Sequence, residues 1–172
     1  MITERKTLKT TLTYSEDMSR CYAVTIEWEK EKPKAAVIML SAGKTDGVCF
    51  DKTTGCVIKN LVALGYGSVD ILNLFSSLDG TKEDTEDEEN LEIIGILAKS
   101  AKTVVFAVGT GHKTNKKVQA RQKEVIEILK MYDEKLYCIS DETGEKFYHP
   151  LCPKVYRWNL VQVNSKRLCE DD

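Results

Sequence analysis

The sequence predicts an α/β protein, a three-layer α/β/α sandwich with a central, mostly parallel sheet and a preceding antiparallel hairpin. Two observations predict this class. Short apolar runs alternate with helical patterns between residues 35 and 140, an order typical of parallel strands joined by helices. Before residue 30, apolar and polar residues alternate with period two, which indicates antiparallel strands.

The chain length predicts one domain, because 172 residues build a single core and leave little room for a second. We expect this domain to span residues 1–172. Within it, residues 1–34 form an N-terminal hairpin extension, residues 35–153 form the core, and residues 154–172 form a C-terminal tail.

The first elements follow from local patterns. The hairpin strands take residues 8–14 and 21–28, on either side of a polar break. An uninterrupted apolar run at residues 35–40 indicates a strand covered on both faces. Apolar residues at helical spacing predict a helix over residues 54–64, and Gly65 ends it because glycine tolerates a left-handed C-cap.

The second half of the core continues the alternation. Strands are expected over residues 68–75, 103–108 and 136–140. The capping-box spacing of Thr85 and Glu88 predicts the start of a helix that runs to about Ser100, and a third helix, marked by apolar residues from Val118 onward, reaches about Tyr132. A short terminal strand is expected between residues 155 and 163.

Composition excludes several classes of protein. Lys and Arg total 25 against 27 Asp and Glu, and 42% of the residues are hydrophobic, which excludes a disordered acidic chain and a basic nucleic-acid coat. No stretch reaches the roughly 18 to 20 apolar residues of a membrane helix, and residues 1–13 hold no apolar signal core. We therefore expect a cytoplasmic protein that does not act at a membrane.

The six cysteines contain no C-x-x-C pair. In a reducing compartment, scattered cysteines of this kind are expected to be small core hydrophobes rather than metal ligands or nucleophiles. The sequence also lacks the H-E-x-x-H, G-x-S-x-G, Walker and G-x-G-x-x-G motifs. We expect no metal and no cofactor.

The positive and negative charges, which nearly cancel over the whole chain, are unevenly distributed in two segments. Residues 79–92 hold eight carboxylates, either a capped, solvated helix start or a negative surface for a protein partner. Residues 112–123 hold five Lys and Arg residues and no carboxylate. These cations either keep one helix face soluble or bind phosphate next to the glycines at positions 109 and 111.

We expect the ligand-binding site at the carboxyl ends of the core strands, because ligands of parallel sheets bind there. Asn73 ends one apolar strand, and its carboxamide either reads a planar amide such as a nucleobase edge or bonds to a neighbouring loop. His149 precedes Pro150, which fixes an extended backbone. Its imidazole is either a general acid or base or an exposed loop side chain.

Several spaced motifs resemble a bacterial and phage family, domain of unknown function 1643. They are residues 39–46, 51–53, 65–67 and 73–75, then Asn90, Gly109, Arg121 and residues 144–151, and the likeness extends from about Arg20 to Leu151. The chain differs at the first loop, where Ser41, Ala42, Gly43 and Lys44 replace the family's usual Asn-Pro-Ser-Thr. It differs again at Val108, where the family has Trp.

The order of strands and loops is similar, more distantly, to the uracil-DNA glycosylase superfamily. In those enzymes an Asn reads a flipped base and a His-Pro loop supports the departing pyrimidine, which implies those roles for Asn73 and His149. Their first loop carries an Asp or Asn that positions water. Ser41 stands at that place, and Asp46 and Asp51 are the nearby carboxylates that could substitute.

These observations predict a protein that binds a nucleobase, nucleotide or nucleic acid, with N-glycosidic bond cleavage as its most specific activity. The candidate catalytic residues are His149, Asp46 and Asp51. The candidate ligand-binding residues are Ser41, Thr45, Thr53, Asn73, Phe75, Gly109, Lys113 and Arg121. The alternative is a non-catalytic interaction protein that keeps the fold and has lost the activity, as the altered first loop and the acidic window suggest.

Overall fold

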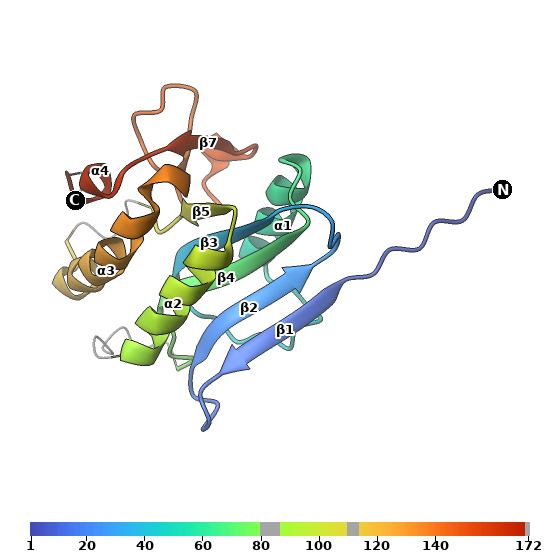
Figure 1. Ribbon diagram of the computed structural model, residues 1–172, viewed down its shortest axis with the longest axis horizontal. Coiled ribbons are helices and arrows are strands. Elements are labelled where there is room, and N and C mark those ends of the chain that lie inside the picture. Colours follow the sequence, from blue (N-terminus) through green and yellow to red (C-terminus); the bar gives the residue numbers. More distant parts are fainter. Residues whose placement is uncertain (80–86, 110–113, 171–172) are drawn as a thin grey trace.

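In the computed structural model, which describes residues 1–79, 87–109 and 114–170, one mixed sheet is covered by helices on both faces (Figure 1). The strands are β1 (Lys9–Tyr14), β2 (Cys21–Glu27), β3 (Lys34–Ser41), β4 (Ser68–Phe75), β5 (Thr103–Phe106), β6 (Leu136–Ser140) and β7 (Asn159–Gln162). The helices are α1 (Lys52–Ala63), α2 (Glu88–Ser100), α3 (Lys116–Leu129) and α4 (Ser165–Glu170), with 3₁₀ turns at Lys130–Lys135 and Pro153–Val155. The predicted α/β class is confirmed.

The sheet order is β1-β2-β4-β3-β5-β6-β7. Strands β4, β3, β5 and β6 pair in parallel, whereas β1 with β2, β2 with β4, and β6 with β7 are antiparallel. The expectation of a mostly parallel sheet is therefore wrong at both edges. The N-terminal hairpin joins this sheet, because Ala23 of β2 pairs with Leu72 of β4.

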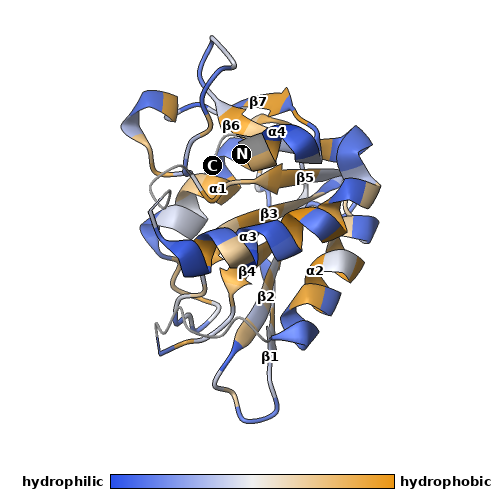
Figure 2. Cartoon of the chain, turned by 90° about the vertical axis from the view of Figure 1, so that its left-hand side faces the viewer, coloured by the Kyte–Doolittle hydropathy of each residue, from blue (hydrophilic) through white to orange (hydrophobic). Residues whose placement is uncertain are grey.

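Two hydrophobic clusters lie on opposite faces of the sheet, because successive side chains of a strand point to opposite sides. In β3, Val37 packs toward α1, where it belongs to the same cluster as Val57 and Leu61. Its neighbour Ile38 packs toward α2 and α3, in the cluster that holds Ile94. In Figure 2 the central strands are mostly orange, and the side of α3 that faces the viewer is largely blue.

Side chains fix where the helices begin. Asp51 caps α1 by accepting a hydrogen bond from the Thr54 amide, and Gly65, at φ +87°, follows the end of the helix as expected. Helix α2 is capped by Asp87, whose carboxylate accepts from the Asn90 amide. The predicted capping box is therefore not the observed cap, and its Thr85 lies outside the described residues.

The six cysteines are free thiols, and only Cys21 and Cys138 are buried. The expectation that they are mostly core hydrophobes is wrong for Cys49 and Cys169, which are exposed. Among the described residues, no group of three or more His, Cys, Asp and Glu side chains could hold a metal ion. None of the described helices has the length and apolar character that a bilayer crossing requires.

Candidate functional site at the carboxyl edge of the sheet

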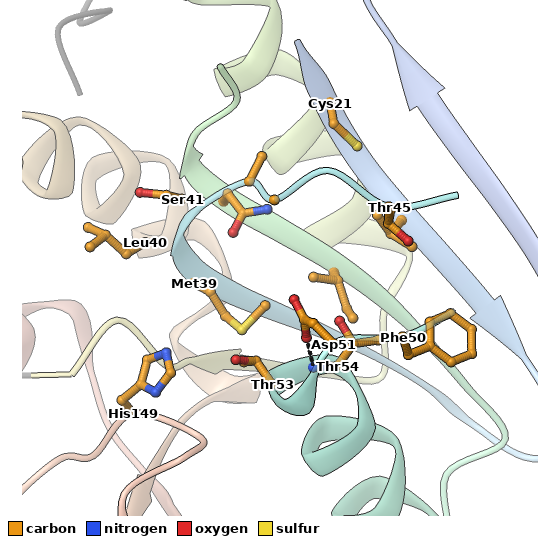
Figure 3. Close-up of a pocket in the computed structure, with 15 residues that line it drawn as sticks. Cys21, Met39, Leu40, Ser41, Thr45, Phe50, Asp51, Thr53, Thr54 and His149 are labelled. Atoms are coloured by element: carbon orange, nitrogen blue, oxygen red, sulfur yellow. Dashed lines mark hydrogen bonds between the residues drawn. The ribbon is translucent and has the colours of Figure 1, made fainter. Parts of the chain in front are cut away.

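A pocket of about 260 Å³ lies at the carboxyl ends of β3 and β4 (Figure 3). The direction of the connections reverses at β3, which has β4 on one side and β5 on the other, and ligands of open α/β sheets bind at such a point. Six predicted site residues line the pocket: Ser41, Thr45, Asp51, Thr53, Asn73 and His149. The structure thus brings together residues that are up to 108 positions apart, since 149 − 41 = 108.

Apolar side chains form much of the pocket wall. Met39 and Ile71 come from β3 and β4, Val24 comes from β2, and Phe50 comes from the loop before α1. Figure 3 shows Phe50 and Thr45 on one side of the pocket and His149 on the other. The wall is therefore a mixture of apolar surface and a few polar groups, which is the usual composition of a small-molecule site.

Asn73 is the most informative side chain of the pocket. It is only 6% exposed, and its Oδ1 atom has no hydrogen-bond partner among the described residues. A buried polar atom without a partner costs about 1 to 3 kcal/mol, so native proteins rarely keep one without a use. Asn73 lies on the same face of β4 as Ile71, two residues earlier, and both line the pocket.

The two carboxylates of the loop from β3 to α1 lie in different environments. Asp51 lines the pocket and caps α1 through Oδ1, at 2.7 Å from the Thr54 amide nitrogen. Asp46 is exposed, does not line the pocket and accepts hydrogen bonds from the amides of Cys49 and Val48 at 2.7 and 2.8 Å. These two amides, that of Cys49 first, lower the pKa of Asp46.

His149 reaches the pocket from the loop that follows β6. Gly109, just beyond β5, has φ +76°, and a Cβ atom there would lie 3.1 Å from the Cβ atom of His149. The loop therefore packs directly against the end of β5. The Leu151 amide donates to Nδ1 of His149 at 3.2 Å, so a neutral imidazole carries its proton on Nε2.

Tyr148 and Asp141 hold this loop in place through hydrogen bonds. The Tyr148 amide donates to the Ile139 carbonyl at 2.9 Å, and the Tyr148 hydroxyl donates to the Asp141 carboxylate at 2.6 Å. The Asp141 hydrogen bond, together with desolvation, raises the pKa of Tyr148 to about 12. On the other side, the Cys56 thiol of α1 donates to the Pro150 carbonyl at 3.2 Å. His149 is therefore held between two anchored neighbours.

A comparison with protein-family models matches residues 21–151 to the family described as "Protein of unknown function (DUF1643)". The chain belongs to the DUF1643 family. No curated protein and no solved structure matches it. The DUF1643 match begins at β2 and ends just after His149, so it contains every residue that lines the pocket. It leaves out β1, β7 and α4.

Three other described candidates of this DUF1643 protein do not line the pocket. Phe75 is buried in the cluster that faces α2 and α3, and Gly109 packs against His149. Arg121 is fully buried, and its guanidinium donates to the carbonyls of Leu74 and Asp87. Lys113 lies outside the described residues, as does most of the glycine-rich turn after residue 109.

Sequence reasoning missed several residues that line the pocket. Phe50 stands directly before the cap of α1, where an apolar residue next to a helix start is a recognisable signal. Cys21 and Val24 had no such signal, because they come from the hairpin extension, whereas the site was expected at the strand ends of the core. The pairing of β2 with β4 is what brings both of them to the site.

Proposed function

We propose that the pocket binds a nucleobase, either free or as part of a nucleotide or nucleic acid. The buried carboxamide of Asn73 carries this proposal, since it offers one acceptor and two donors beside apolar walls. A nucleobase edge presents the complementary donors and acceptors. A volume of about 260 Å³ also suits a single ring system better than a larger ligand, because drug-sized ligands occupy about 300 to 1,000 Å³.

The activity that we propose for this site is hydrolysis of an N-glycosidic bond. In that reaction the bond from the base to C1′ of the sugar breaks, the oxygen of water bonds to C1′, and the base leaves with the electron pair. Asp51 is the pocket carboxylate that would accept the water proton. His149 would donate from Nε2 to an oxygen of the leaving base, because Nδ1 already accepts from Leu151.

The similarity to the uracil-DNA glycosylase superfamily supports the same activity. It rests on the order of the elements: Asn73 near the end of β4, Gly109 beyond β5 and His149 after β6. The first loop departs from that pattern at Ser41, and Asp51 is the carboxylate that we propose in its place. Residues 80–86 of the acidic window at residues 79–92, which motivated the alternative of a protein partner, lie outside the described residues.

Calorimetric titration with free adenine, guanine, cytosine and uracil tests the binding proposal. We expect one base to bind the wild-type protein and Asn73→Leu to abolish the binding. Asn60→Leu is the matched control, because Asn60 is a buried asparagine like Asn73 but lies on α1, donates to the Cys56 carbonyl and does not line the pocket. Equal binding by wild type and Asn73→Leu, or no binding of any base, would sink the proposal.

Release of a base from DNA tests the catalytic part separately. Oligonucleotides that carry single modified or deaminated bases are incubated with the protein, and abasic sites are detected by alkaline cleavage of the strand. We expect release by the wild type, and a loss of at least about 100-fold for His149→Ala or Asp51→Asn if these groups act as general acid and base. Binding without release of any base would leave a binding protein and refute the hydrolase.

A further inference from the structure

The strand that carries Asn73 is irregular at that residue on the side of β2. Ala23 pairs with Leu72, but the next bridge joins Arg20 to Ser77. From the first pair to the second, the chain on the β2 side moves 23 − 20 = 3 positions, whereas the chain on the β4 side moves 77 − 72 = 5 positions. The β4 side therefore contains two extra residues. On its other side β4 keeps an unbroken parallel register with β3, through Met39 with Asn73. The irregularity is therefore a bulge of β4 away from β2.

A bulge leaves carbonyl groups without the ladder donors that a regular partner strand supplies. Side chains from the helices replace those donors here. Nδ2 of Asn90, on α2, donates to the carbonyls of Asn73 and Leu74 at 3.0 and 3.3 Å. Nε of Arg121, on α3, donates to the Leu74 carbonyl at 2.9 Å. Both side chains are fully buried, at 0% exposure.

The two donors are themselves held in place at the start of α2. Asp87 accepts from the Asn90 amide at 3.1 Å through its carboxylate, and from Arg121 at 3.0 Å through its carbonyl. Arg20, directly before β2, donates to the same carboxylate at 3.1 Å. The bulge is thus bound to β2, α2 and α3 through one set of hydrogen bonds.

We propose that Asn90 and Arg121 are positioning residues, which hold the bulged peptides of β4 and thereby aim the carboxamide of Asn73 into the pocket. Bulges next to functional sites commonly re-aim a side chain in this way. The two residues touch no ligand and act through Asn73. What Asn73 binds rests on the proposed function, whereas its orientation does not.

Asn90→Leu removes both hydrogen bonds that Asn90 donates to the bulge and keeps the approximate volume. Arg121→Lys is a second variant that keeps the positive charge. It weakens the support of the bulge, because an ammonium group cannot replace the planar guanidinium at two carbonyls. Asn60→Leu is the control, since it also deletes hydrogen bonds from a buried asparagine to the backbone, but on α1. The side-chain amide signals of Asn73 in ¹H–¹⁵N spectra and the affinity for the four free bases are measured in each variant.

We expect the Asn73 side-chain signals to move in both variants and to stay in place in Asn60→Leu, with an affinity about tenfold weaker in Asn90→Leu. Unchanged Asn73 signals in Arg121→Lys and Asn90→Leu would overturn the proposal, even if both proteins were less stable. If Asn90→Leu does not fold, the signals of Arg121→Lys decide. If the wild type binds no base, the proposed function fails, and the spectra still decide the positioning role.

Discussion

Replacing Gly109 by alanine tests the packing that brings His149 to the sheet edge. At φ +76°, an added Cβ atom would lie 3.1 Å from the Cβ atom and 3.2 Å from the backbone nitrogen of His149. The left-handed backbone costs an alanine about 1 to 2 kcal/mol, and an overpacked contact costs about 1 kcal/mol or more. We therefore expect Gly109→Ala to lose about 2 to 4 kcal/mol of unfolding free energy.

For a chain of this length, each kcal/mol lowers the melting temperature by about 2 to 4 °C, so Gly109→Ala is expected to melt roughly 4 to 16 °C below the wild type. Differential scanning calorimetry and urea unfolding measure the change. Gly55→Ala is the matched control: it lies inside α1, and its Cβ atom would meet nothing within 4 Å. We expect it to stabilise by about 0.5 to 1 kcal/mol. A Gly109→Ala protein as stable as the wild type would refute the contact with His149.

Three further predictions concern α1 and the loop between β6 and His149. Asp51→Ala removes the cap of α1 and should cost about 1 kcal/mol in urea unfolding, whereas Asp51→Asn should cost little. Leu61→Ala empties a fully buried position and should cost about 2 to 5 kcal/mol by the same measurement. The hydroxyls of Thr143 and Tyr148, in that order, lower the pKa of Asp141, so Thr143→Val and Tyr148→Phe should each raise it in ¹³C carboxyl titrations. Because the folded pKa is lowered, this carboxylate stabilises the fold above its unfolded pKa of about 3.9, and the contribution disappears as the pH falls through the folded value.

The parallel core could be predicted because its signals are local. A continuous apolar run such as residues 35–40 identifies a strand covered on both faces, and Gly65 identifies the end of a helix. The edges could not be predicted in the same way. Whether the hairpin stands apart or joins the sheet depends on the pairing of Ala23 with Leu72, which no short stretch of sequence encodes.

The residues of the candidate site also differ in whether local sequence could predict their position. Asn73 and His149 line one pocket as residues at strand ends, and the order of the strands places such ends together. Arg121 was different, because a cation in a basic stretch of helix gives no sign that it is buried. One of its partners is the Leu74 carbonyl in the bulge of β4, and the bulge is a property of the assembled sheet.

Crystals of the wild-type protein soaked with brominated nucleobases test the central claim most directly. The anomalous signal of bromine locates the base without reference to any assumed binding mode. We predict a bromine peak in the pocket between Asn73 and His149, with an edge of the ring within hydrogen-bond distance of the Asn73 carboxamide. A base bound elsewhere on the molecule, or an empty pocket at saturating concentrations of all four bases, would contradict it.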